Sequence, residues 1–95
     1  MLGDPLGIES GTVSLSWQVY IIRCTDGSLY TGITTDVSRR FEEHATGKGA
    51  RYFRGRKPAS VCYSETASDR SEASKRESEI KQMTRAQKEE LINVD

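Results

Sequence analysis

The chain has 95 residues, a formal net charge of zero and an ordinary share of charged side chains. This length predicts one domain with a small core, and the balanced charge decides nothing about a nucleic-acid partner, so local clusters of charge must decide. Residues 1–16 contain Asp4 and Glu9, no basic run and no long apolar run, which is typical of a flexible tail rather than a signal peptide or membrane span. Cys24 and Cys62 lack metal-ligand spacing, and we expect reduced, buried thiols in a cytoplasmic protein.

Three runs of residues predict β-strands. Trp17–Cys24 and Leu29–Thr34 are rich in β-branched and aromatic residues and flank the short loop Thr25–Gly27, which is a hairpin signal. Pro58 opens a third run, Ala59–Glu65, in which larger and smaller side chains alternate. We therefore expect an α/β (α+β) domain with a small three-stranded antiparallel sheet flanked by helices.

The length of the hairpin loop decides which side chains share a face, because strand side chains alternate with a period of two. A two-residue turn would direct Tyr20 and Tyr30 to opposite faces. A three-residue loop with a left-handed Gly27 places Tyr20 opposite Gly32 and both tyrosines on one face. The order Thr-Asp-Gly favours this second form.

A helix is predicted over Asp36–Thr46, with Gly47 as the residue that ends it. Val37, Phe41 and Ala45 recur at helical spacing and are expected to form its buried stripe.

The same helix carries two adjacent arginines and a histidine. His44 lies beside the predicted stripe, and Arg40 lies one turn before it on the same flank. Arg39 is rotated further round the helix. The geometry therefore selects Arg40 as the arginine near the protein body and Arg39 as the more solvated one.

A second helix is predicted to start near Asp69, with a stripe through Ala73, Glu77 and Ile80. Glu77 stands where the period requires an apolar residue, and a carboxylate directed at the protein body is costly unless it is paired or binds a cation. A salt bridge to a base such as Arg40 is the simpler interpretation of Glu77 taken alone.

Two further features complete the pattern. Thr84–Gln87 is a capping box that predicts a short last helix.

The segment Gly47–Lys57 has five positive charges and no acid, with Tyr52 and Phe53 between the arginines. This composition is typical of a surface that follows phosphates, although packing on the core is the favoured interpretation of the two rings. The candidate nucleic-acid contacts are Lys48, Arg51, Arg54, Arg56 and Lys57.

The two strands of the hairpin also carry a resemblance. Gln18-Val19-Tyr20 and Tyr30-Thr31-Gly32 resemble the two signature triplets of the GIY-YIG nuclease superfamily. The tyrosines and the final glycine agree with the signature, whereas the first triplet lacks its glycine and the second lacks its isoleucine, at positions that vary in the family. Ile33 follows where some members have a lysine, which removes one charge that could activate a base.

Residues further along the chain strengthen the resemblance. The family pattern has an arginine followed by a bulky apolar residue, a histidine four residues after that arginine in many members, and a late glutamate on a helix after the third strand. Arg40, Phe41, His44 and Glu77 match it. The resemblance covers residues 17–92 and is closest to the small stand-alone bacterial branch of the superfamily.

The resemblance implies a DNA endonuclease that uses one divalent ion, Mg²⁺ or Mn²⁺. Glu77 would supply a hard oxygen ligand, and Arg40 would hold the scissile phosphate. Tyr30 or Tyr20 would take the proton of the attacking water, although a free phenol has a pKa near ~10 that nearby cations must lower. His44 would relay a proton or contact phosphate.

Each of these residues alone has an ordinary structural role, as a packed aromatic, a satisfied histidine or a paired acid. Their joint occurrence in the family's register favours an endonuclease, with a role in DNA repair or recombination and a partner protein that supplies specificity. A non-catalytic nucleic-acid-binding module with the same fold is the alternative. An adaptor between proteins would need a large exposed apolar patch, which the sequence does not indicate.

Overall fold

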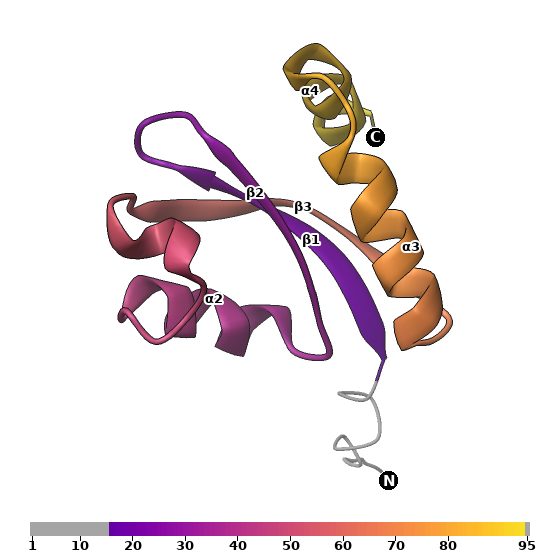
Figure 1. Ribbon diagram of the computed structural model, residues 1–95, viewed down its shortest axis with the longest axis horizontal. Helices are drawn as coiled ribbons and strands as arrows, with labels where there is room; N and C mark the ends of the chain where they lie inside the picture. Colours follow the sequence, from indigo (N-terminus) through magenta and orange to yellow (C-terminus); the bar gives the residue numbers. More distant parts are fainter. Residues whose placement is uncertain (1–15, 95) are drawn as a thin grey trace, which may run out of the picture.

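The computed structural model describes residues 16–94, which form an α+β fold with helices on both faces of a three-stranded antiparallel sheet (Figure 1). The predicted tail lies outside the described residues, apart from Ser16. None of the helices in the described range is long and apolar enough to cross a membrane. The elements in chain order are β1 (Trp17–Cys24), β2 (Leu29–Thr34), α2 (Val37–Ala45), the 3-10 helix η1 (Arg51–Arg54), β3 (Pro58–Ala67), α3 (Arg70–Lys81) and α4 (Arg85–Asn93).

The hairpin has the predicted three-residue loop. The Cys24 N–H donates to the Ser28 carbonyl at 2.9 Å, and Gly27 has a φ of 87°, a conformation that glycine adopts without steric cost. In this register Tyr20 pairs with Gly32, and Tyr30 pairs with Ile22. Both tyrosines therefore belong to one face of the sheet, as predicted.

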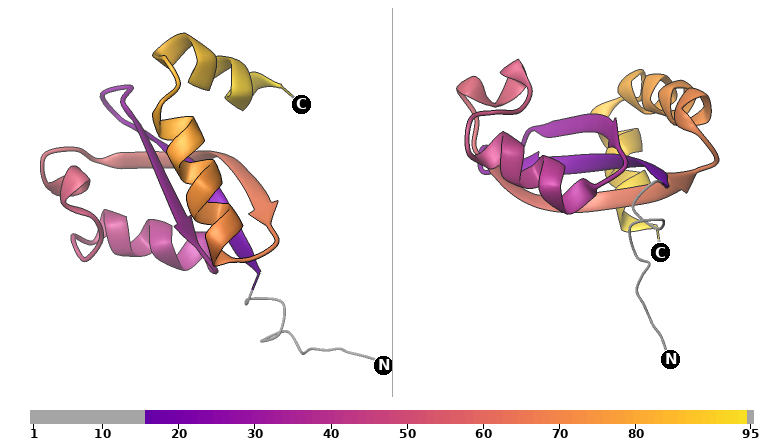
Figure 2. Two further views of the ribbon diagram at one scale, coloured as in Figure 1. Left: turned by 45° about the vertical axis from the view of Figure 1, so that its right-hand side comes forward. Right: turned by 90° about the horizontal axis from the view of Figure 1, so that it is seen from below.

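The sheet has the strand order β2-β1-β3, so β1 is central and is buried on both faces. Tyr20 and Ile22 pack with Phe53 on the face that α2 and η1 cover. Val19 and Ile21 alternate with them and pack under α3, on the opposite face (Figure 2). The site described below develops around the first of these two cores.

Helix α2 differs from its prediction in one detail. The Asp36 side chain accepts from the Arg39 N–H and caps the helix as expected. However, Ala45 is exposed, and His44 is the fully buried residue of the helix. The physical reason is that the segment after α2 folds back over His44, with the Ala50 N–H donating to His44 Nδ1.

Strand β3 is longer than predicted and is irregular. Ile21 pairs with Tyr63, but Ile22 pairs with Val61, so Cys62 is an extra residue at a β-bulge. The bulge interrupts the alternation that the sequence suggested. Val61 is consequently 37% exposed, whereas Cys62 packs against the core under α3.

The last two helices begin as predicted. The Asp69 side chain caps α3, and Thr84 and Gln87 form the capping box of α4. Arg23 of β1 makes two hydrogen bonds to the Glu89 carboxylate, at 2.9 and 2.7 Å, which tie α4 to the sheet.

Candidate active site

Four of the predicted site residues come together on the α2 side of the sheet. β1 supplies Tyr20, β2 supplies Tyr30, and α2 supplies Arg40 and His44. The Tyr30 ring lies 5.2 Å from the His44 ring and 6.3 Å from the Tyr20 ring, measured between centroids. Register and helix packing thus assemble residues that are up to 24 positions apart.

A buried hydrogen bond joins Tyr20 to His44. The Tyr20 Oη lies 3.0 Å from His44 Nε2, and these side chains are almost fully buried. On the other side of the imidazole, Nδ1 accepts from the Ala50 backbone N–H at 3.1 Å. Because an N–H can only donate, the neutral imidazole carries its proton on Nε2 and donates it to Tyr20.

Burial moves the pKa values of both residues toward their neutral forms. Desolvation, with a smaller contribution from the Arg40 charge, lowers the pKa of His44 from 6.5 to about 4. Desolvation also raises the pKa of Tyr20, assisted by Tyr30 and opposed by the Arg40 charge. His44 is therefore a neutral donor near pH 7, and Tyr20 is a neutral phenol whose ionised form Arg40 would favour.

Two glycines make room for this pair. A Cβ atom on Gly32 would lie 2.6 Å from the Tyr20 Oη and 3.1 Å from the Tyr30 ring. A Cβ atom on Gly49 would lie 2.0 Å from His44 Nδ1. Gly32 thus allows the Tyr20 ring to lie across β2, which gives the last residue of the Tyr-x-Gly triplet a steric reason.

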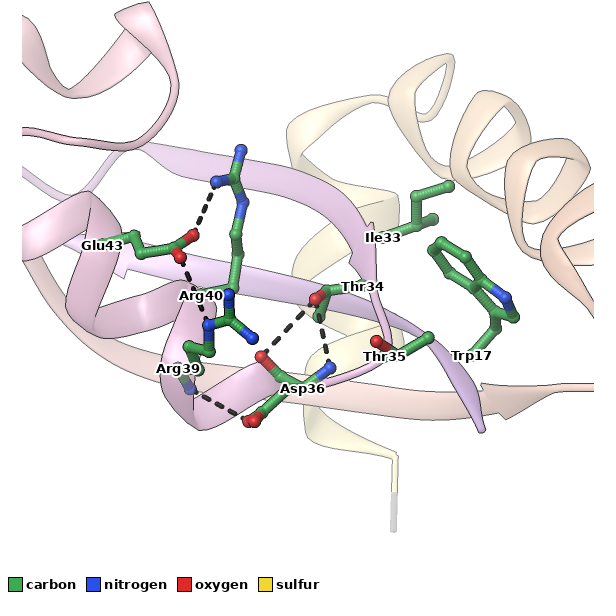
Figure 3. A pocket seen from close by; sticks show the side chains of 8 residues that line it. All are labelled: Trp17, Ile33, Thr34, Thr35, Asp36, Arg39, Arg40 and Glu43. Carbon is green, nitrogen blue, oxygen red and sulfur yellow. Dashed lines mark hydrogen bonds and ion pairs between the residues drawn. The ribbon is translucent and has the colours of Figure 1, made fainter. Parts of the chain in front are cut away.

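Arg40 is held beside the pair by a carboxylate. Its Nη1 lies 2.8 Å from Glu43, and its side chain is 35% exposed. Arg39 contacts the same carboxylate at 3.4 Å but is 74% exposed. This difference confirms that Arg40 is the arginine nearer the protein body, and Figure 3 shows Glu43 between the two guanidinium groups.

Glu77 belongs to α3, the helix that packs on the opposite face of the sheet from Tyr20 and His44. Its side chain is 23% exposed, and its carboxylate lies 3.1 Å from Lys81 Nζ. Its charge makes only a small contribution to the raised pKa of Tyr20. The salt-bridge alternative is thus realised with Lys81, whereas Arg40 pairs with Glu43.

The donors available suit one lightly held metal ion. Within residues 16–94 there is no group of three or more His, Cys, Asp or Glu side chains that could hold a metal. A lone half-buried carboxylate such as Glu77 fits a hard divalent cation whose remaining ligands are water and substrate oxygens.

The basic segment 47–57 forms an exposed rim next to His44. All five of its cations, Lys48, Arg51, Arg54, Arg56 and Lys57, are exposed. Tyr52 and Phe53 pack against Tyr30, as the favoured interpretation expected. A hollow of about 370 Å³ lies between this rim and His44.

Sequence reasoning missed three contributors to the site. Gly49 and Ala50 orient His44, but a backbone N–H leaves no signal in a sequence. Glu43 orients Arg40, and its three-residue spacing from Arg40 could have identified it.

The chain is similar to known proteins over most of its length. The family model described as "GIY-YIG catalytic domain" matches residues 16–90. The UPF0213 protein DP2720 of Desulfotalea psychrophila is 55% identical over 78 residues, which are 81% of this chain and 71% of that protein. A UPF0213 protein of Cronobacter sakazakii is 53% identical over 76 residues, which are 80% of each chain.

A solved structure is also similar. The solution NMR structure of the UPF0213 protein BH0048 from Bacillus halodurans has a TM-score of 0.53 and 47% sequence identity, and the match covers 81% of this chain and 82% of that one. The signature residues, the fold and these matches together show that the chain belongs to the GIY-YIG catalytic domain family.

Proposed function

We propose that the protein is a divalent-metal-dependent endonuclease that hydrolyses phosphodiester bonds of DNA. The observation that carries the proposal is the hydrogen-bonded pair of Tyr20 and His44 beside Arg40. Burial raises the pKa of this phenol, and the fixed donor and the cation beside it offset part of the cost of forming a phenolate.

Arg40 is the candidate for the phosphate contact. Glu43 holds one side of its guanidinium through Nη1 at 2.8 Å, which orients the group, while the partial exposure of the side chain leaves other N–H donors for a ligand. Two parallel N–H donors match two phosphate oxygens, so Arg40 can bind and orient the scissile phosphate.

Tyr20 is the better of the two candidates for the general base, and it would act as a phenolate after its own proton has gone to solvent. Burial raises its pKa, whereas the hydrogen bond from His44 and the Arg40 charge oppose that rise and favour the ionised form. Tyr30 packs among the rings of His44, Tyr52 and Phe53 and serves to hold them in place. In this assignment His44 positions Tyr20 and does not accept its proton, because the free lone pair of the imidazole is already used by Ala50.

Glu77 is the residue that would hold one Mg²⁺ or Mn²⁺ ion. Such an ion supplies positive charge at the phosphate and at the leaving oxygen. The ion pair between Glu77 and Lys81 neutralises the carboxylate when no cation is bound. A cation must therefore compete with Lys81 for Glu77.

The basic segment 47–57 would contact the DNA backbone beside the reaction centre. Its five cations are exposed, and a phosphate-tracking surface next to the catalytic pair suits a polyanionic substrate. The free thiols of Cys24 and Cys62 support a cytoplasmic protein, and a partner protein could add specificity to a domain this small.

One observation favours the alternative, a nucleic-acid-binding module without catalysis. Glu77 is already paired with Lys81, and a permanent pair would need no metal. Cleavage assays separate the two functions, because only the endonuclease requires both the acid and the phenol.

The test is cleavage of labelled duplex, flap and branched DNA with Mg²⁺ or Mn²⁺ by the parent, Glu77→Ala and Tyr20→Phe. We expect metal-dependent cleavage by the parent and none by Glu77→Ala or Tyr20→Phe, with DNA binding retained by both of these variants and cleavage retained by the control described next. Glu72→Ala on the same helix is the matched control, because Glu72 pairs with Lys75 on the solvent side. Tight, salt-sensitive binding by all four proteins without cleavage would support the binding module instead.

A further inference from the structure

A second pocket adjoins the proposed active site at the end of the sheet away from the basic segment. It has a volume of about 310 Å³ and lies between the start of β1, the end of β2 and the first turns of α2 (Figure 3). Arg40 lines this pocket and also faces Tyr20, so the pocket and the reaction centre share one side chain. The proposed function makes no use of the remaining lining residues.

The walls of the pocket differ in chemistry. Trp17 and Ile33 lie side by side on one side, and Arg39 and Arg40 lie on the other (Figure 3). Thr34 lies between the two sides. A flat apolar surface opposite two guanidinium groups matches the two parts of a nucleotide, an aromatic base and an anionic phosphate.

Two acids, Asp36 and Glu43, line the pocket together with Arg39 and Arg40, so a phosphate has to draw the Arg39 guanidinium away from Glu43. Glu43 contacts both guanidinium groups, but the contact to Arg39 is the longer one, 3.4 Å against 2.8 Å for Arg40. Arg39 is also 74% exposed, so it can turn toward a ligand at little cost. A further cation, Arg70, lies 5.6 Å from the centroid of the Trp17 ring and adds positive charge near the pocket.

The indole constrains the kind of nucleotide that fits. A base inside a duplex is paired and stacked on its neighbours, so it can stack on Trp17 only after it leaves the helix. A nucleotide that is already unpaired needs no such step. Binding on this surface would therefore depend on the pairing state of the nucleotide rather than on the edge of its base.

We propose that the pocket lined by Trp17, Ile33 and Arg39 is a subsite for one unpaired nucleotide of DNA next to the bond that is cleaved. The inference rests on the proposed endonuclease and names its substrate class, which is DNA with an unpaired nucleotide at the cleavage position. The base packs on Trp17 and Ile33, and its phosphate binds Arg39 while Arg40 holds the neighbouring phosphate.

Trp17 itself is the probe, because it is the only tryptophan of the chain. Its fluorescence is followed while Glu77→Ala is titrated with three DNAs of one sequence, a full duplex, a duplex with one unpaired nucleotide and a single strand. Fluorescence anisotropy of labelled DNA measures binding independently. We expect saturable quenching by the single strand and by the duplex with the unpaired nucleotide, at lower concentrations than by the full duplex.

Variants locate the effect in the pocket. Trp17→Leu should weaken binding of the single strand roughly tenfold, Trp17→Phe should restore part of that loss, and both should bind the full duplex as the parent does. Arg39→Gln should reduce the slope of log binding constant against log salt by about the amount that one phosphate contact contributes. Lys75→Gln is the matched control, because Lys75 is 70% exposed and pairs loosely with a helix acid at 3.5 Å, as Arg39 does.

An abasic scan gives the position of the nucleotide. A single missing base should weaken binding at one position next to the cleaved bond in the parent and at none in Trp17→Leu. Unchanged Trp17 fluorescence on saturation with single strand, or equal loss of duplex and single-strand binding in Arg39→Gln and Lys75→Gln, would overturn the subsite. If the subsite is overturned but the parent still cleaves DNA, the proposed endonuclease activity stands. Quenching of Trp17 by single strand without any cleavage would support the subsite and contradict the endonuclease activity.

Discussion

The Tyr20 hydroxyl lies 3.0 Å from His44 Nε2, and the opposite nitrogen of the same imidazole accepts from the Ala50 N–H. The backbone of the basic segment thus sets the tautomer of His44, and this tautomer sets which partner of the buried pair donates. The catalytic proposal depends on this chain of hydrogen bonds, and it makes the burial of His44 a source of pH-dependent stability.

The first prediction concerns acid. Because the folded pKa of His44, about 4, lies below the ordinary value of 6.5, the unfolded chain binds more protons between these two values. Stability contributed by the neutral imidazole is therefore present above about pH 6.5 and is lost as the pH falls toward 4, by up to about 3 kcal/mol. Urea unfolding of the parent and His44→Gln at pH 7, 5.5 and 4 measures it.

The comparison isolates His44 because all carboxylates titrate in both proteins. Glu43, whose pKa is lowered chiefly by its hydrogen bond from Arg40, is present in both proteins, so its contribution cancels in the comparison. The free energy of unfolding should fall more steeply in the parent than in His44→Gln. Parallel pH profiles would mean that the imidazole is accessible to protons in the folded state.

The second prediction concerns Gly32. Replacement by Ala places a Cβ atom 2.6 Å from the Tyr20 Oη, so the ring must move away from His44. Gly32→Ala should lower the cleavage rate roughly 100-fold, since displacement of a catalytic group by about 1 Å has that order of effect. The control is Gly55→Ala, because no atom lies within 4 Å of a Cβ at Gly55. Equal cleavage rates of Gly32→Ala and Gly55→Ala would show that catalysis does not depend on the position of the Tyr20 ring.

The third prediction concerns competition for Glu77. Lys81 Nζ lies 3.1 Å from the carboxylate, so a metal ion has to displace it. Lys81→Gln should lower the Mg²⁺ or Mn²⁺ concentration that gives half-maximal cleavage. Lys75→Gln, which breaks a pair with Glu72 on the same helix, should leave it unchanged. The same metal requirement in both variants would show that Glu77 is not the ligand.

The fourth prediction concerns the attachment of α4. Two hydrogen bonds from Arg23 and one from Arg85 lower the pKa of Glu89 to about 2. The ionised Glu89 carboxylate therefore stabilises the fold above the ordinary glutamate pKa of 4.5, and this stabilisation is lost as the pH falls toward 2. Glu89→Gln at pH 7 should speed amide hydrogen exchange in α4 and leave α2 unchanged. Faster exchange throughout the chain would instead indicate one cooperative unit.

The fifth prediction concerns the basic segment. Arg51 and Arg54 are exposed and belong to η1, whose burial depends on Phe53 rather than on these charges. Replacing both with Gln should preserve the fold and reduce the slope of log binding constant against log salt by about 2 for duplex DNA. Binding measured between 50 and 200 mM salt tests this, and an unchanged slope would place the DNA elsewhere.

Much of the fold was predictable because it depends on local pattern. The order Thr-Asp-Gly favours a loop with a left-handed Gly27, and that loop alone places Tyr20 opposite Gly32. The helical spacing of Ala73, Glu77 and Ile80 is also a local pattern, and it predicted that the acid in this stripe of α3 is half buried. The irregular alternation of β3 was not predictable, because a bulge depends on the partner strand.

The amino-acid sequence by itself determined the register of the hairpin, the helix caps and the set of residues that could act in catalysis. Only the tertiary structure decided that Ala50 orients His44, that Lys81 rather than Arg40 pairs with Glu77, and that Trp17 and Arg39 border one pocket. Periodicity assigns a side chain to one face of its own element, because backbone geometry repeats locally. Contacts between elements depend on how those faces pack, and no repeat in the chain records that.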